Sequence, residues 1–134
     1  MTTEAKDILD AILSGWNQKN WEFLEAVHAV DWVDRSSSED TNDLASMKDF
    51  FDSFTTSFPD MKMEIIKSMI CGDEIAYYYN IKGTQERDFL GFPAHGQKVD
   101  FNGMTILKID SGLCTEAWGV TDKMLLFHQL RKNP

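Results

Sequence analysis

Residues 74–84 read EIAYYYNIKGT, and this stretch decides the fold class of the chain. Apolar and aromatic residues occupy every second position from Ile75 to Ile81, which is the period of a β-strand with one buried face. Met61, Met63 and Ile65 alternate with lysine and glutamate in the same way, and the strand runs on towards Cys71. Gly72-Asp73 between the two segments is a turn signal. The pattern therefore predicts two long strands joined by a tight turn.

Two further strands are predicted downstream of a loop marked by glycine and proline. Val99–Ile109 forms a third long strand, and Asp110-Ser111-Gly112 turns the chain into a fourth strand, Leu113–Val120. We expect these last two strands to pair as a hairpin.

The first third of the chain is predicted to be mainly helical. Apolar residues within positions 3–16 recur at a spacing of three and four, which is typical of an amphipathic helix. Asn20 can cap a second short helix. The inner face of that helix is expected to carry Phe23, Leu24 and Val27. A short strand is expected at Asp31–Val33. A third helix runs from Asn42 to Phe58-Pro59-Asp60, where it ends because the residue before a proline is disfavoured in the α region.

This order of elements, helices first and then a meander of long antiparallel strands, predicts the α+β class. A curved antiparallel sheet with N-terminal helices on one face forms a half-open cone, and such a cone usually holds a pocket. No repeat, linker or low-complexity segment interrupts the sequence. Residues 1–134 are therefore expected to form a single domain.

The charge balance bears on the class of partner. The 134 residues include 13 Lys and Arg against 22 Asp and Glu, which gives a net charge of −9. This balance opposes binding to nucleic acid or to anionic lipid. We expect a small hydrophobic ligand and a second copy of the chain as partners, with no nucleic acid and no membrane. No secretory signal and no run of roughly 18 apolar residues is present, which favours a cytoplasmic location.

No metal or cofactor is expected from the motifs. Cys71 and Cys114 lie in apolar surroundings without a CxxC motif, which favours buried free thiols over a disulfide or a zinc site. The three histidines share no metal-ligand spacing. The pattern assigns His28 to the surface at the end of a helix, His95 to a solvated loop and His128 to the chain end.

Several segments, taken in order, carry a family resemblance. They are Phe58-Pro59-Asp60, Gly72-Asp73 with Gly83-Thr84 at the end of the next strand, residues 91–99 (GFPAHGQKV), and residues 116–122 (EAWGVTD) followed by Gln129-Leu130. Together they resemble the SnoaL-like polyketide cyclase family of the nuclear-transport-factor-2-like superfamily, which shares its cystatin-like cone fold with ketosteroid isomerase. The resemblance implies a cone, no metal or cofactor, and a frequent homodimer.

The resemblance also implies a chemistry. Founding members close a ring in an aromatic polyketide by an intramolecular aldol reaction, with an aspartate after the last strand as acid/base. Asp122 occupies that position in this sequence. Two positions depart from the family pattern: Gln85 stands where many relatives have a histidine, and Thr105 stands where founding cyclases have a polar histidine.

Two roles for Asp122 are open from the residues themselves. Its neighbours Trp118, Val120 and the segment 124–127 are apolar, and desolvation by such neighbours raises a carboxyl pKa, as acid/base chemistry requires. Alternatively, Asp122 is the N-cap of the terminal segment, where its carboxylate would satisfy a backbone N–H.

Ligand contacts are expected from aromatic and polar side chains inside the cone. The predicted ligand-binding residues are Trp16, Tyr79, Gln85, Phe101, Thr105 and Trp118. Plain core packing is the alternative for each aromatic residue. Tyr79 and Gln85 share strand parity, so both are expected to point inward and to reach a ligand carbonyl.

The sequence thus predicts cofactor-independent acid/base chemistry, either aldol cyclisation or isomerisation, on a hydrophobic carbonyl compound. The alternative is a non-catalytic module for small-molecule binding or dimerisation. Epoxide hydrolysis of the limonene type needs an Asp-Arg-Asp arrangement in the pocket. It is disfavoured because Arg35, Arg87 and Arg131 all lie outside the predicted strands.

Overall fold

The alternating stretch at residues 74–84 forms β4 (Glu74–Thr84), an inner strand of a six-stranded sheet. The computed structural model describes residues 3–36 and 42–132. In it, β4 pairs antiparallel with β3 (Lys62–Cys71) on one side and with β5 (Lys98–Asp110) on the other. β5 in turn pairs antiparallel with β6 (Leu113–Thr121), which confirms the predicted hairpin.

The sheet continues beyond β6 into strands that come from the first third of the chain. The strand order is β2-β1-β6-β5-β4-β3. β1 (His28–Asp34) is longer than the predicted strand and runs parallel to β6, whereas β2 (Asn42–Asp43) pairs with it antiparallel. The sheet is therefore antiparallel except at the β1–β6 pair. Alternation within one strand cannot predict that pairing, because it depends on where the helices return the chain to the sheet.

The three N-terminal helices begin and end close to the predicted positions. They are α1 (Thr3–Asn17), α2 (Trp21–Glu25) and α3 (Leu44–Ser57). The Asn20 side chain accepts a hydrogen bond from the N–H of Glu22 and thus caps α2. The Asp43 carboxylate likewise accepts from the N–H of Ser46 at 2.9 Å and caps α3.

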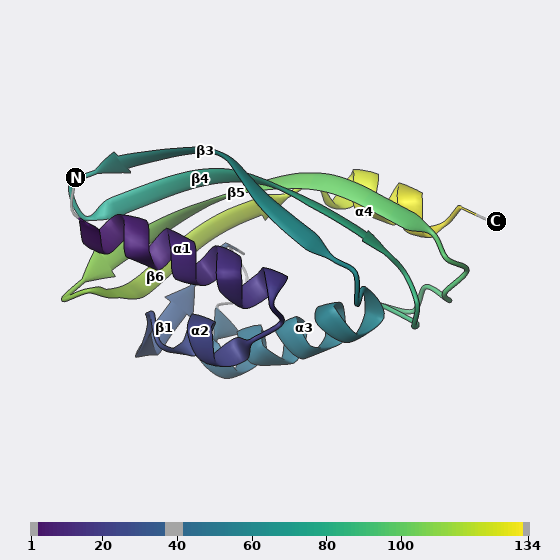
Figure 1. Cartoon of the computed structure of the whole chain (residues 1–134), viewed down its shortest axis with the longest axis horizontal. Helices are drawn as coiled ribbons and strands as arrows, with labels where there is room; N and C mark the ends of the chain where they lie inside the picture. Colours follow the sequence, from purple (N-terminus) through teal and green to yellow (C-terminus); the bar gives the residue numbers. More distant parts are fainter. Residues whose placement is uncertain (1–2, 37–41, 133–134) are drawn as a thin grey trace.

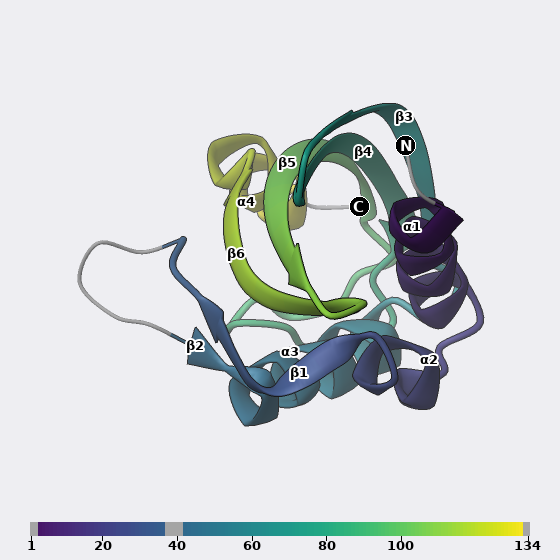
Figure 2. The same cartoon turned by 90° about the vertical axis from the view of Figure 1, so that its left-hand side faces the viewer.

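These helices lie along one side of the curved sheet (Figure 1). Figure 2 shows strands β3 to β6 as an open arc, with α1 at one end and α2, α3 and β1 across the open side. The C-terminal helix α4 (Lys123–Leu130) follows β6 and packs against β5. The structure confirms the predicted α+β cone with N-terminal helices.

An aromatic cluster fills the core between α3 and the sheet. Its centre is Phe54, which is 2% exposed and has ring centroids within 6.4 Å on several sides. The contacting rings are those of Trp16, Phe50, Phe58, Phe89 and Phe101. Phe54 is therefore the residue at which the aromatic side chains of α3 contact the inward-facing Phe101 of β5.

Phe23 and Cys71 are more exposed than the sequence predicted. Phe23 is exposed, because the single turn of α2 buries only Leu24. Cys71 is also exposed, because β3 loses its inward-outward alternation after a register shift between Ile65 and Lys67. Cys114 is buried as predicted, and both thiols are free.

Candidate functional site

A cavity of about 280 Å³ lies between the concave face of the sheet and the helices. Most of the side chains lining it are apolar, with Ile12 from α1, Phe54 from α3, Met63 from β3 and Leu126 from α4. The volume is close to the lower end of the range of roughly 300–1,000 Å³ that small-molecule sites occupy.

Hydroxyl groups from three neighbouring strands line the sheet wall of the cavity. Tyr77 and Tyr79 come from β4, Thr105 from β5 and Thr121 from β6. The Tyr79 hydroxyl lies 3.2 Å from Oγ1 of Thr121, and Tyr77 faces Thr105 in the strand register. Burial raises the pKa of both phenols, so both stay protonated at neutral pH and can donate hydrogen bonds.

Gly103 gives the Tyr79 ring its position. A Cβ atom at residue 103 of β5 would overlap both the hydroxyl oxygen and Cζ of Tyr79. The ring therefore lies directly over the glycine, in the register that pairs these two residues. Because Gly103 has no side chain, the Tyr79 ring can extend across β5 and place its hydroxyl next to Thr121 of β6.

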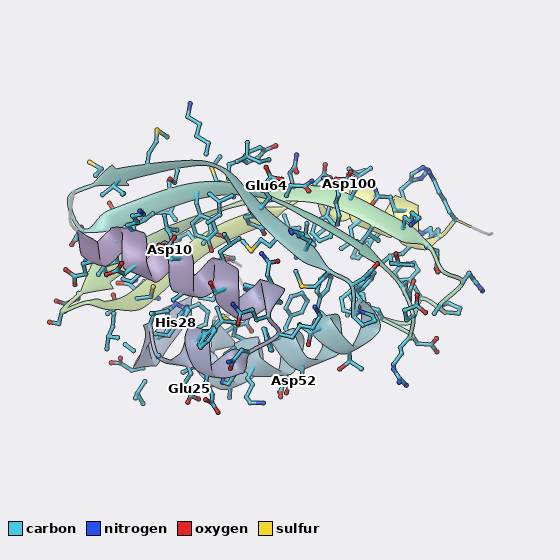
Figure 3. All side chains as sticks on the ribbon, viewed as in Figure 1. Asp10, Glu25, His28, Asp52, Glu64 and Asp100 are labelled. Atoms are coloured by element: carbon cyan, nitrogen blue, oxygen red, sulfur yellow. The ribbon has the colours of Figure 1, made fainter. Side chains whose placement is uncertain are left out.

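The wall formed by β1 carries a buried histidine. His28 is 7% exposed, lines the cavity, and places Nδ1 2.6 Å from the carbonyl oxygen of Leu24. The Trp32 ring packs edge to face against the imidazole, with the ring planes at 90° and the centroids 5.3 Å apart. Figure 3 shows His28 on the inner side of the helices, near α1 and α2, with Glu25 and Asp52 on the outer side.

Burial lowers the pKa of His28 below its ordinary value of 6.5, although the hydrogen bond to Leu24 opposes this shift. Unfolding exposes the imidazole to water, where it binds a proton more readily. The stability that the neutral imidazole contributes is therefore fully present above pH 6.5 and is lost as the pH falls below it.

We expect a His28→Asn variant to lose less stability than the wild type between pH 7.5 and pH 5.5. The asparagine amide keeps a donor for the Leu24 carbonyl but has no proton to gain. The difference is at most about 1.4 kcal/mol, because protonation of the unfolded chain sets its upper limit. Urea denaturation at both pH values measures it, with the exposed His128→Asn as the control. An identical pH dependence in wild type and His28→Asn would contradict the prediction.

The end of β1 is fixed to β6 at the rim of the cavity. The Asp34 carboxylate, which lines the cavity, accepts hydrogen bonds from the N–H and the hydroxyl of Ser36. The Ser36 hydroxyl oxygen accepts from the N–H of Gly119 at 2.7 Å. Nε of Arg35 lies 2.6 Å from the Glu116 carboxylate. These contacts hold a carboxylate at the cavity edge.

The predicted ligand-binding residues separate into two groups. Trp16, Tyr79, Phe101 and Thr105 line the cavity, and their role in ligand binding stays a prediction. Trp118 and Gln85 are absent from its walls.

Strand parity and loop packing explain these two departures. Trp118 is exposed on the outer face of β6, because Ala117 and Gly119 take the inward positions of that strand. Gln85 is fully buried beyond the end of β4, where its amide nitrogen donates to the carbonyls of Arg87 and Phe92. Its side chain therefore holds the following loop together.

Asp122 is exposed and caps α4. Its carboxylate accepts a hydrogen bond from the N–H of Leu125 at 3.1 Å, and the residue is not among those lining the cavity. The expectation of an internal, desolvated carboxylate is therefore wrong, and the capping alternative describes its position. Its role in proton transfer stays a prediction.

The sequence did not predict three residues of the β1 wall, namely His28, Trp32 and Asp34. The sequence pattern assigned His28 to the surface. In the structure it is the first residue of β1, and its side chain is buried and lines the cavity. Periodicity could not reveal this wall, because a register shift between His28 and Val33 interrupts the strand and leaves Val30 95% exposed.

Two further observations concern the described part of the chain as a whole. Within residues 3–36 and 42–132, no group of three or more His, Cys, Asp or Glu side chains is placed to hold a metal ion. None of the helices in the same part of the chain is long and apolar enough to span a membrane.

Comparisons with solved structures show the same fold in several bacterial proteins. AclR, a candidate hydroxylase from Streptomyces galilaeus, is 23% identical over the full length of both chains, with a TM-score of 0.90. IdmH, a candidate polyketide cyclase from Streptomyces antibioticus, is 20% identical over 96% of this chain and 99% of its own, with a TM-score of 0.82.

A candidate polyketide cyclase from Acidithiobacillus ferrooxidans is 25% identical over 98% of this chain and 96% of its own, with a TM-score of 0.81. None of the curated proteins compared with the chain matches it. A family model described as SnoaL-like polyketide cyclase matches residues 6–130. The chain therefore belongs to the SnoaL-like polyketide cyclase family.

Proposed function

We propose that the protein binds a hydrophobic carbonyl compound of two or three fused rings in the cavity and catalyses proton transfer on it. The reaction needs no cofactor and is an isomerisation or an intramolecular aldol cyclisation. The observation that carries this proposal is the row of hydroxyl groups, from Tyr77 to Thr121, on one wall of an otherwise mainly apolar cavity.

The hydroxyl row suits an enolate. When a proton leaves the carbon next to a carbonyl, negative charge develops on the carbonyl oxygen. Tyr77 and Tyr79 are protonated at neutral pH and lie in a space lined mainly by apolar side chains, where a hydrogen bond to that oxygen is stronger than in water. Thr121 can donate to Tyr79 and leave the phenol proton free for the ligand.

The family and the cavity support this chemistry together. IdmH and the protein from Acidithiobacillus ferrooxidans are candidate cyclases, whereas AclR is a candidate hydroxylase on the same fold. The fold therefore does not select the reaction, and the side chains of the cavity must do so.

Two other functions are less well supported. A non-catalytic binding module would need no donors aimed at one ligand oxygen, although it would use the same apolar walls. Epoxide hydrolysis by an Asp-Arg-Asp arrangement would need an arginine in the cavity. No arginine is among the lining residues of the described part of the chain, and Arg35 pairs with Glu116 outside it.

Deuterium exchange of 2-tetralone tests the proposed function. The C1 hydrogens of this bicyclic ketone lie between an aromatic ring and the carbonyl, so their exchange in D2O can be followed by proton NMR. We expect the wild type to accelerate exchange at least about 100-fold over buffer, the lower range of general acid–base catalysis. Tetralin, which has no oxygen, should inhibit competitively.

A cavity-filling variant tests whether the exchange reaction takes place in the cavity. Ala117 lines the cavity from β6 and is 4% exposed, so Ala117→Phe places a ring inside it. This variant should keep the wild-type circular dichroism spectrum and lose the exchange activity. Binding of 2-tetralone without any acceleration by the wild type would contradict the catalytic proposal and favour the binding module.

The outer face of the sheet is the surface on which we expect a two-fold homodimer. It carries a row of exposed apolar side chains on β4, β5 and β6, namely Tyr78, Met104, Ile106, Trp118 and Val120. The strand register places Met104 beside Val120 and Ile106 beside Trp118, so these side chains form one patch.

The dimer prediction is tested by sedimentation equilibrium at micromolar concentration. We expect the wild type to be a dimer and Ile106→Glu to be a monomer, because the two-fold axis would bury two copies of the new charge. Val30→Glu, on the exposed edge of β1, is the control and should stay dimeric. A monomeric wild type would exclude the dimer and leave the fold unaffected.

A further inference from the structure

We propose that His28 is the acid/base residue of the cavity: its Nε2 takes the proton from the carbon next to the ligand carbonyl and later returns it. The inference rests on the proposed function, because it assumes a carbonyl compound in the same cavity. It is independent of Asp122, whose carboxylate lies outside the cavity.

The hydrogen bond of the imidazole fixes its tautomer. Nδ1 lies 2.6 Å from the carbonyl oxygen of Leu24, and a carbonyl oxygen only accepts, so Nδ1 carries the proton. In the neutral ring Nε2 then holds the free lone pair. No residue of the described chain is a hydrogen-bond partner of Nε2.

Nε2 of His28 is not fully enclosed by protein atoms. In the described residues, two buried side-chain atoms are fully enclosed without a partner, Trp32 Nε1 and Gln85 Oε1, and Nε2 of His28 is not one of them. Because Nδ1 points back to α2, the opposite edge of the ring points away from that helix. His28 itself lines the cavity.

Two neighbours hold the ring in this orientation. Trp32 packs edge to face against it at 90°, and the strand register places Cys114 of β6 beside it. Trp32 is therefore a positioning residue, because it orients the imidazole without reaching the reacting carbon.

The surroundings keep the imidazole neutral at pH 7. Burial lowers the pKa of His28 below 6.5, so the free base predominates at neutral pH. The other ionisable side chains of the cavity are Asp34 on β1, Tyr77 and Tyr79 on β4 and Lys123 on α4. The lining residues from α1 and α3 carry no ionisable group, and burial raises the pKa of the Cys114 thiol to about 12.

The proposed step balances without another reactant. Nε2 takes the proton, the electrons of the C–H bond form the new C=C bond, and the π electrons of the carbonyl move to its oxygen, which accepts a hydrogen bond from a Tyr77 or Tyr79 phenol. Where a C=C bond of the ligand is conjugated with the enolate, return of the proton to the far carbon of that bond shifts the double bond and gives an isomer. If the enolate carbon instead attacks a second carbonyl, the imidazolium protonates the new alkoxide and a ring closes.

The weakness of this base decides which ketone suits the test. An imidazole with a lowered pKa does not readily deprotonate a simple ketone, because the proton transfer would be strongly uphill. The test ketone therefore needs a carbon that lies between its carbonyl and a second activating group. 2-Tetralone has such a carbon at C1, next to its aromatic ring.

The test compares His28→Asn with wild type in the deuterium exchange of 2-tetralone. The variant keeps a donor for Leu24 but has no basic nitrogen, so we expect exchange to fall at least about 100-fold. The dissociation constant of the ketone, measured by titration of tryptophan fluorescence, should stay within about threefold of wild type. His128→Asn, on the exposed face of α4, is the control and should keep wild-type exchange.

A pH profile provides a readout that a purely structural role would not change. Exchange by the wild type should be level above pH 6.5 and fall at lower pH, as His28 takes up a proton. This measurement keeps the proposal testable if the asparagine variant does not fold. A rate that stays level down to the pH at which the protein unfolds would overturn the assignment.

The outcomes separate the two proposals. If wild type accelerates exchange and His28→Asn does so equally, His28 is not the base and the proposed function stands, with Asp34 as the next candidate. If Asp122→Asn loses exchange and His28→Asn keeps it, the base is the aspartate that the family resemblance implies. If wild type binds the ketone without accelerating exchange, both proposals fail.

Discussion

Replacing Phe54 with alanine is expected to lower the free energy of unfolding by about 3–5 kcal/mol. Phe54 is 2% exposed and lies at the centre of the aromatic cluster, with the ring centroid of Phe58 4.6 Å away and that of Phe89 5.5 Å away. Truncation would remove buried ring surface and leave a void beside the cavity. The surrounding rings are held by α3 and by the sheet, so they can refill the void only in part.

The measurement is urea denaturation at pH 7.5, with Phe50→Ala as the matched control. Phe50 lies on the same helix and stacks on Phe54 at 5.8 Å, but it is 47% exposed. It buries less surface, so its replacement should have a clearly smaller effect. Equal effects at the two positions would show that Phe54 is not the centre of the core.

Replacing Gly103 with alanine is expected to lower the free energy of unfolding by about 1–3 kcal/mol and to weaken ketone binding. The new methyl group would overlap the hydroxyl and Cζ of Tyr79, so the ring must leave its place over the strand. Its hydrogen bond with Thr121 would break, and the phenol would no longer face the ligand oxygen. The loss of stability and the loss of ketone binding are therefore both expected to come from the overlap between residue 103 and Tyr79.

A double-mutant cycle assigns the effect to that contact. In a Tyr79→Leu background the ring is gone, so Gly103→Ala should be much less destabilising than in the wild type. Urea denaturation of the four proteins gives the coupling free energy. Equal effects of Gly103→Ala in both backgrounds would show that Tyr79 does not set the requirement for glycine.

The β4 part of the sheet wall could be predicted because it depends on parity alone. Alternation along residues 75–81 placed Tyr77 and Tyr79 on the same face of the strand, whereas Thr105 entered the prediction through the family resemblance and Phe101 as an aromatic residue. Parity also explains the error at Trp118. Ala117 and Gly119 are inward residues of β6. Because both are small and Trp118 between them is a large aromatic residue, the sequence suggests that Trp118 is the residue that faces inward.

The β1 wall could not be predicted, because it depends on contacts between segments. His28 becomes a cavity residue only when the Leu24 carbonyl, the Trp32 ring and the parallel pairing with β6 come together. The position of the Asp122 side chain depends in the same way on another segment, the helix α4 that it caps. An aspartate before a short apolar segment fits both a desolvated carboxylate and an N-cap, and the direction in which the segment turns decides between them.

The position of a bound enolate mimic tests the central claim most directly. 2-Naphthol is a planar analogue of the enol of 2-tetralone, and a crystal structure of its complex would locate the oxygen and C1. We predict the oxygen within hydrogen-bond distance of the Tyr77 or Tyr79 hydroxyl, and C1 about 3–3.5 Å from Nε2 of His28, the separation of a reactive complex. A naphthol bound on the outer face of the sheet, or with its oxygen against Ile12 and Leu126, would contradict the account.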